Sequence, residues 1–311
     1  MNRLIYIEFL VVTGLILIFG GAAHQRNLVW KDNLLLWSDV VEKSPGKFRD
    51  HNNLGEAYAK LEQYDQAMSE FKYTLTLNPR ADKAHNNMGN LYQAMDRIDL
   101  AIAEYKKALE LQPRSREALL NLGACYFKNG LHRMAISTYR RVLEIRPGYV
   151  KARCSLGSVY NEMGLVDMAI REYQAALSIE PDHAKSNYNM GLAYDKKGFL
   201  DQAVTHYKKA LSQKPDYPEA LSNLGVIYAK MGQLDQAIDL FEHALGFKPD
   251  DPVTMLNLAF AYEQSAKRKE QSMKRKELRV KAVQTYQKVL TVDPDNVQAR
   301  ERLQKLTANS L

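Results

Sequence analysis

Apolar residues follow two different patterns along this chain. Residues 4–23 are apolar almost throughout, with Glu8 as their one charge. From residue 48 onward, small, aromatic and proline residues recur with a period of 34. An apolar run of about 20 residues is long enough to cross a bilayer as a helix, and a fixed period of this length is typical of stacked helical hairpins. The pattern therefore predicts one membrane helix followed by a long helical array.

Every repeat contains the same succession of residue types. A glycine is followed three residues later by a tyrosine, then by an alanine, by an aromatic four residues after that alanine, and by a closing proline. The glycines are Gly55, Gly89, Gly123, Gly157, Gly191 and Gly225, with Ala259 in the seventh position, and the later aromatics are Phe71, Tyr105, Tyr139, Tyr173, Tyr207 and Phe241.

Each repeated position has a physical reason. Glycine and alanine are small, so they let two antiparallel helices approach, and we expect both aromatics to fill the space between successive hairpins. A second set of glycines is predicted to cap the first helix, an aspartate to open the second helix, and the proline to end it. The capping glycines are Gly130, Gly164, Gly198 and Gly232, and the aspartates are Asp65, Asp99, Asp167, Asp201 and Asp235.

This pattern resembles the tetratricopeptide repeat (TPR) family. The resemblance implies an all-α, right-handed superhelical solenoid, with a half repeat in the linker 24–47, about 7.5 repeats in total and a polar capping helix at 297–308. We expect a tail at 1–3, the membrane helix at 4–23, seven repeats over 48–296, and the cap with its tail at 297–311. The repeats are predicted at 48–81, 82–115, 116–149, 150–183, 184–217, 218–251 and 252–296.

The N-terminal apolar run has two interpretations. Gly21 and Ala23 fit the small-residue pattern that precedes a signal-peptide cut, which would release a chain beginning at His24. The run is longer than the 7–15 residues usual for the apolar part of a signal peptide, so a retained single-pass anchor is favoured. Arg3 on one side and Arg26 and Lys31 on the other give no clear orientation.

The junction resembles a narrower group, the transmembrane-and-TPR O-mannosyltransferases. An apolar helix precedes Arg26, Trp30, Trp37 and the segment Asn53-Leu54-Gly55 in the spacing found there. The resemblance implies that the repeats lie outside the cytosol, in a periplasm or lumen. The catalytic multi-helix region of that group is missing, so its activity is not carried over. An alternative hypothesis remains, that the chain is the substrate-recognition arm of a membrane O-glycosyltransferase whose catalytic part is on another chain.

Composition and motifs disfavour several kinds of function. Of the formal charge of +7, the segment Lys267–Lys281 contributes +6, from eight Lys or Arg and two Glu, which is unlike a spread nucleic-acid-binding surface. Cys125 and Cys154 have no metal-type spacing. His51 and His85 share one repeat position, and we favour two polar residues in a tolerant surface position over a metal pair. We expect no cofactor, no metal and no catalysis.

A candidate binding site follows from one repeated polar position. Two residues before the repeated glycine, asparagine occurs in six of seven repeats, although it is a poor helix former. The TPR resemblance places this position on a concave groove, and O-linked N-acetylglucosamine transferases have a similar asparagine ladder that holds peptide backbone. Inheritance by duplication is the competing explanation. The ladder is Asn53, Asn87, Asn121, Asn189, Asn223 and Asn257, with Ser155 in the fourth repeat.

Two positions next to the ladder narrow the kinds of partner that the groove is expected to bind. The residue before each ladder position is never lysine, so capture of a chaperone tail by a carboxylate clamp is not expected. The residue after each repeated glycine changes from polar to apolar, so the C-terminal half is expected to prefer apolar side chains. That series is Glu56, Asn90, Ala124, Ser158, Leu192, Val226 and Phe260.

The seventh repeat is expanded by 11 residues, because Tyr262 and Ala282 are 20 apart where Tyr228 and Ala237 are 9 apart. We expect a longer hairpin with a basic tip, in which Glu277 and Lys281 pair. A solvated tip and a dock for anionic lipid or an acidic partner are both consistent with it. This basic hairpin comprises Lys267, Arg268, Lys269, Lys274, Arg275 and Lys276. The chain as a whole is predicted to be a membrane-anchored scaffold that binds extended polypeptides.

Overall fold

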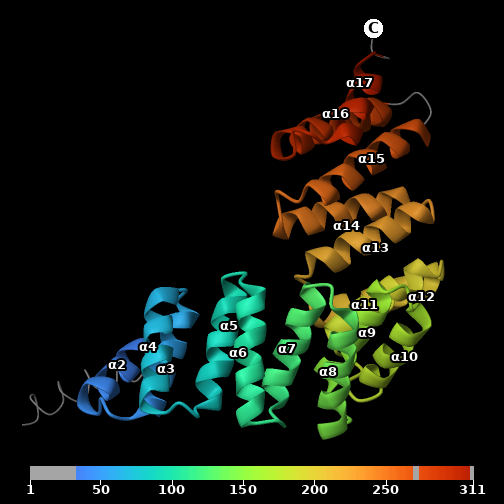
Figure 1. Ribbon diagram of the computed structural model, residues 1–311. Helices are drawn as coiled ribbons and strands as arrows, with labels where there is room; N and C mark the ends of the chain where they lie inside the picture. The colour runs from blue at the N-terminus through green and yellow to red at the C-terminus, as the bar shows by residue number, and fades with distance from the viewer. Residues whose placement is uncertain (1–32, 269–272, 309–311) are drawn as a thin grey trace, which may run out of the picture. The chain divides into compact units, whose positions relative to one another are not determined.

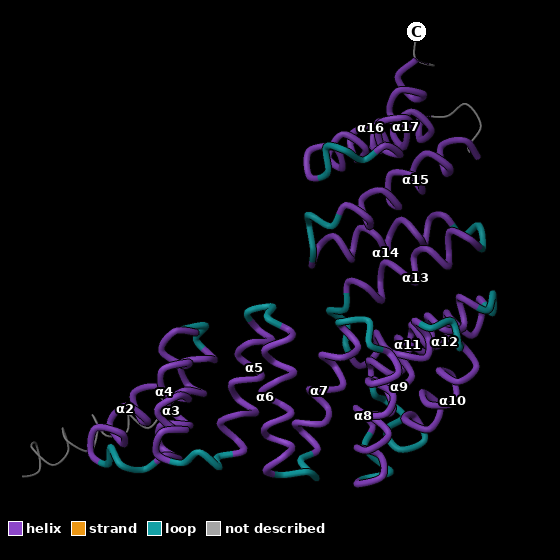
Figure 2. The backbone as a smooth tube through the Cα atoms, in the orientation of Figure 1, coloured by secondary structure: helices purple, strands orange, loops and turns teal. Residues whose placement is uncertain are grey.

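A computed structural model describes residues 33–268 and 273–308. Sixteen helices and no strand occur in these ranges (Figures 1 and 2), which confirms the all-helical prediction. The predicted membrane helix at 4–23 lies outside the described residues. Within the described ranges, no helix combines the length and the apolar character that a bilayer crossing needs.

The helices form two compact units, divided between Ile145 and Arg146, and each is described by itself. The first unit contains α2 (Asn33–Lys43), α3 (Phe48–Lys60), α4 (Tyr64–Leu77), α5 (Asp82–Ala94), α6 (Ile98–Leu111), α7 (Arg116–Lys128) and α8 (His132–Ile145). The second contains α9 (Val150–Glu162), α10 (Val166–Leu177), α11 (Ala184–Lys196), α12 (Leu200–Gln213), α13 (Pro218–Lys230), α14 (Leu234–Phe247), α15 (Pro252–Arg268), α16 (Met273–Val292) and α17 (Val297–Ala308).

Each repeat is one antiparallel hairpin. α3 packs on α4, α5 on α6 and α7 on α8 in the first unit, and the pairs α9–α10 to α15–α16 do the same in the second. α2 covers α3 at one end, and α17 covers α16 at the other. Short loops join the helices (Figure 2), and within each unit every hairpin packs against its neighbours in sequence.

The repeated glycine and the second repeated aromatic meet inside one hairpin. A Cβ atom added to Gly157 would lie 2.5 Å from the Cε1 atom of Tyr173, and each of the other five glycines faces its own aromatic at 2.6–2.7 Å. Tyr173 is fully buried. The sequence placed this aromatic between successive hairpins. Its ring lies instead against the glycine in the first helix of the same hairpin. The ring fits there because glycine has no side chain.

The turn after the first helix has a left-handed residue in six repeats. Gly130, Gly164, Gly198 and Gly232 have φ angles of +69° to +79°, as the predicted caps require. In the first two repeats, Glu62 and Asp96 adopt φ 59° at the same position. This conformation costs a residue with a Cβ about 1–2 kcal/mol, so the first two hairpins bear strain that the next four avoid with glycine.

The seventh hairpin has longer helices than the others. α15 has 17 residues and α16 has 20, where α13 and α14 have 13 and 14. Glu277 and Lys281 lie 3.3 Å apart, which confirms the predicted pair. The segment predicted to be a capping helix forms α17.

Gly157→Ala tests the packing of glycine on aromatic. Alanine is the better helix former by about 1 kcal/mol, but a methyl group forced against the buried Tyr173 ring costs about 1–3 kcal/mol. We expect a net loss of stability in urea unfolding. The matched control is Gly246→Ala in α14, where nothing lies within 4 Å of the added Cβ. Its midpoint should rise, and equal shifts for both variants would contradict the packing account.

Candidate functional site: the inner faces of the two units

The first helices of neighbouring hairpins contact one another, whereas the second helices make no comparable contact in the described residues. α3 touches α5 and α5 touches α7 in the first unit, and α9 touches α11 and α13 touches α15 in the second. A stack of hairpins curves toward the side where its helices come together. The first helices therefore form the inner face of each unit, and that face carries the asparagine ladder.

The ladder amides join successive hairpins. Asn87 donates to the Asn52 side-chain oxygen at 3.0 Å and to the Glu56 carboxylate at 2.7 Å. Asn121 donates to Asn90 at 2.9 Å in the same way. Each amide thus bonds to the hairpin before it, so the repeated asparagine has a structural role that neither inheritance nor peptide binding had suggested.

The second unit repeats this arrangement. Asn189 donates to the Ser158 hydroxyl at 3.0 Å and lies 3.4 Å from the Cys154 sulfur. Asn223 donates to the Tyr188 hydroxyl at 3.0 Å. The residues that the sequence assigned to groove polarity, such as Glu56, Asn90 and Ser158, are therefore acceptors for the next hairpin.

Two ladder positions differ from the rest. The side chains of Asn53 and Asn257 make no hydrogen bond within the described residues, and both are half-buried. Asn53 comes first in the ladder, and Asn257 follows a repeat whose corresponding residue is Val226. These two amides are complete donors and acceptors for a ligand.

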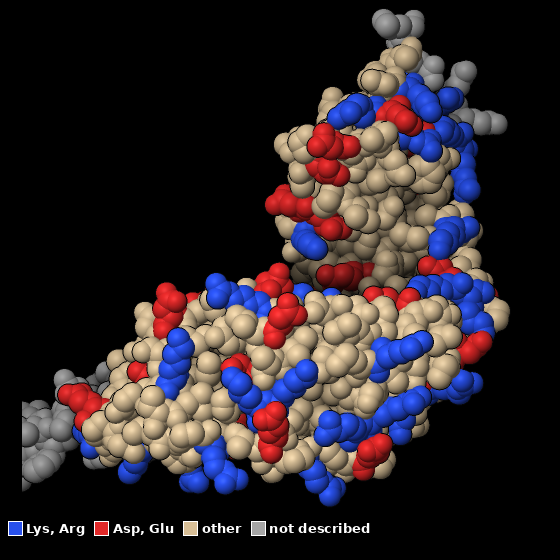
Figure 3. All heavy atoms as spheres, viewed as in Figure 1, with Lys and Arg blue, Asp and Glu red and all other residues tan. Residues whose placement is uncertain are grey.

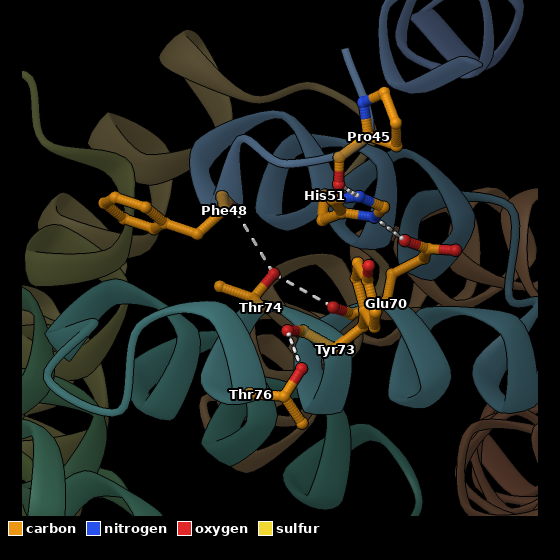
Figure 4. Close-up of polar contacts among 7 residues, drawn as sticks. All are labelled: Pro45, Phe48, His51, Glu70, Tyr73, Thr74 and Thr76. Carbon is orange, nitrogen blue, oxygen red and sulfur yellow. Dashed lines mark hydrogen bonds and ion pairs between the residues drawn. The ribbon is translucent and has the colours of Figure 1, made fainter.

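The His51 position is not on the surface, as the sequence suggested, but inside the first hairpin (Figure 4). Its ring is buried, with Nδ1 2.6 Å from the Glu70 carboxylate and Nε2 2.9 Å from the Pro45 carbonyl oxygen. The Tyr73 ring packs edge-on against it, 4.5 Å between centroids. The imidazole therefore joins the incoming loop to both helices.

Later hairpins reuse this clamp with other residues. His85 lies 2.6 Å from Glu104. Arg153 donates to the Pro147 carbonyl and to Glu172, both at 3.0 Å. Asn187 donates to the Pro181 carbonyl at 2.9 Å. All four residues contact a partner 19 positions later, and three of them, His51, Arg153 and Asn187, also contact the carbonyl of the proline six positions earlier.

His51 and His85 therefore each bind a glutamate of their own hairpin and do not form a metal pair. In the described residues, no group of three or more His, Cys, Asp or Glu side chains could hold a metal ion. Cys125 and Cys154 are both buried. Burial raises the pKa of the Cys125 thiol to about 11, which keeps it protonated at neutral pH.

The basic hairpin gathers Lys and Arg around α15 and α16 (Figure 3). Lys267 pairs with the buried Glu263 at 2.6 Å, and Arg268 donates to the Gly232 carbonyl at 2.7 Å. Lys274 and Lys276 are exposed. Lys269 lies outside the described residues. Several of these cations thus hold the hairpin itself, and docking to an anionic partner remains a prediction.

His51→Ala should loosen the first hairpin. The change leaves the Glu70 carboxylate and the Pro45 carbonyl without their partner, at a cost of about 1–3 kcal/mol. Because contacts in a repeat array are mostly local, amide hydrogen exchange should accelerate in α3 and α4 and stay unchanged in α13 and α14. The control is exposed His243→Ala in α14. Unchanged exchange in α3 would show that the clamp does not hold the hairpin.

Models of repeat families match more than half of the chain. Models described as tetratricopeptide repeat match residues 51–80, 80–148 and 218–251, and one described as TPR repeat matches 160–198 and 196–232. Among curated proteins, no relative matches the chain.

Solved structures share the fold. The APC/C hetero-tetramer Cut9–Hcn1 is 17% identical with a TM-score of 0.68, and the match covers 88% of this chain and 52% of that one, about half its length. PilF of Pseudomonas aeruginosa is 17% identical with a TM-score of 0.62, covering 72% and 97%. A thermophilic TPR protein of Thermus thermophilus is 27% identical with a TM-score of 0.51, covering 58% and 98%.

Proposed function

Because this chain belongs to the tetratricopeptide repeat family, we propose that it is a membrane-anchored scaffold that binds extended polypeptides along its inner faces. The observation that carries the proposal is the row of amide oxygens on those faces. Four of the six ladder amides donate to the preceding hairpin, and the oxygens of all six accept no bond from the described residues. An extended peptide offers backbone N–H groups to such acceptors whatever its side chains are.

The donor bonds also favour binding by fixing the amides in advance. Asn121 and Asn223 are half-buried, and each is held by one bond from its nitrogen. Immobilising a mobile side chain on binding costs about 0.5–1.5 kcal/mol. A side chain that is already ordered avoids most of this cost. The ladder thereby combines cohesion between hairpins with a prepared set of acceptors.

The anchor and its side of the membrane belong to the same proposal. The apolar run 4–23 supports a single-pass anchor. The resemblance of the junction supports placing the repeats outside the cytosol, in a periplasm or lumen. The same resemblance is the basis of the alternative, an arm that presents polypeptides to a membrane O-glycosyltransferase, and such an arm would use the same inner faces.

Peptide binding should depend on the two amides that take no part in cohesion. We expect Asn53→Ala with Asn257→Ala to weaken binding of a neutral, end-blocked peptide by about tenfold, if each lost hydrogen bond is worth about 0.7 kcal/mol. Fluorescence anisotropy of the full-length chain in neutral detergent measures it. The control is Asn129→Ala, an exposed amide at the end of α7. Unchanged affinity with an unmoved thermal transition would remove the ladder from the site.

Membrane anchoring has its own test. The full-length protein should stay in the pellet after alkaline carbonate extraction, while a chain of residues 33–311 should be released. A mature N-terminus at His24 would instead establish a cleaved signal peptide. Protease added outside sealed cells should digest the repeats, and complete protection would reverse the proposed topology.

A further inference from the structure

A polar niche lies between the first two hairpins of the first unit. Its volume is about 640 Å³, and α3, the end of α4, the loop after it and the start of α5 line it. Arg49 and the ladder residue Asn53 come from α3, Arg80 from the loop, and Lys83 from α5. Since α3 and α5 are first helices, the niche opens on the inner face.

The positive charges of this niche have no ion-pair partners within the described residues. Arg80 and Lys83 are exposed, and their side chains form no hydrogen bond or ion pair within the described residues. The Arg49 guanidinium lies 5.7 Å from the centroid of the Phe48 ring, a contact that leaves its charge unpaired. Asp82 is the one carboxylate in the lining, against three cations.

The corresponding niche of the second unit has the opposite character. It lies between the sixth and seventh hairpins, has a volume of about 210 Å³, and is lined at the same repeat positions by Glu219, Asn223 and Thr254. Lys248, its one cation, lies 3.6 Å from Asp251. The first niche thus has three cations without an ion-pair partner, whereas the second has one cation beside two carboxylates.

The basic lining also ends within the first unit. The position of Arg49 and Lys83 is taken in the third repeat by Glu117. Its carboxylate accepts a bond from the Asn86 amide at 3.1 Å. Within the first unit, the unpaired cations at this position therefore occur only in the first two hairpins, and lysine returns to it at Lys151 and Lys185 in the second unit.

We propose that this niche binds side-chain carboxylates of an acidic segment in an extended polypeptide, which refines, and rests on, the function proposed above. Guanidinium groups match carboxylates with two parallel hydrogen bonds, and the unpaired Asn53 amide adds a donor beside them. Asn52 and Asn86 stand where a clamp for a terminal carboxylate would need lysine, so an internal segment is favoured. A flat lipid surface cannot enter a concave inner face.

The test compares end-blocked peptides of equal length that alternate serine with glutamate or with glutamine. Full-length protein in neutral detergent should bind the glutamate peptide about tenfold more tightly at low ionic strength, and added salt should reduce this preference. Arg80→Gln with Lys83→Gln should remove most of the preference. Both side chains are exposed and unpaired, so the fold should not change. The matched control is Lys72→Gln with Lys106→Gln, which removes two exposed lysines from the second helices α4 and α6 of the same unit.

Each outcome decides between the two proposals. Equal binding of the two peptides would overturn the acidic-segment inference and leave the scaffold proposal standing. Equal losses in the Arg80/Lys83 variant and the control would assign the preference to net charge and overturn the niche. Displacement of the glutamate peptide by inorganic phosphate at the same concentration would assign the niche to small anions. If neither peptide binds, the scaffold proposal fails and the inference fails with it.

Discussion

The contact between the repeated glycine and the repeated aromatic sets the distance between the two helices of each hairpin. Its geometry leaves no room for a Cβ atom in six repeats, and the rings it seats are among the largest fully buried side chains, such as Tyr105, Tyr139 and Tyr207. Because the hairpin width is fixed, the first helices of neighbouring hairpins present their side chains in a constant register. The ladder bonds, the clamps and the niches all depend on that register.

The inner faces show how one residue type can serve two purposes. An asparagine amide has a donor end and an acceptor end, and the hairpin before it uses the donor end. Where the preceding repeat offers an acceptor, as Glu56 does for Asn87, the amide ties the array together. Where the preceding repeat has Val226, which has no side-chain acceptor, both the N–H donors and the oxygen of the Asn257 amide are available to a ligand. Cohesion and binding capacity therefore depend on whether the preceding repeat supplies an acceptor, either the residue after its glycine or, for Asn223, the Tyr188 hydroxyl.

The fold was predictable where it depends on residues that are close together in the sequence. Period, glycine, aspartate and proline gave the helices, their caps and their ends, because these are local effects. The His51 clamp was missed because its partners, Pro45 and Glu70, are defined by packing. A signal was present: histidine, arginine or asparagine recurs 19 residues before glutamate or histidine in four repeats. The unpaired charge of Arg80 could not be inferred, since ion pairing depends on side-chain placement.

Some contacts of this protein lie inside one hairpin and others join neighbouring hairpins. This difference determines which changes in the length of the gene preserve the fold. Each of the first six hairpins carries its own glycine–aromatic contact, so the loss of a whole 34-residue copy leaves the remaining pairs intact. Unequal recombination that removed residues 82–115 would bring Asn121 against Glu56, a competent acceptor, and loss of 184–217 would bring Asn223 against Ser158. Insertions or deletions in other lengths would break the donor–acceptor register. Copy number can therefore drift in whole repeats while each intermediate remains a cohesive protein.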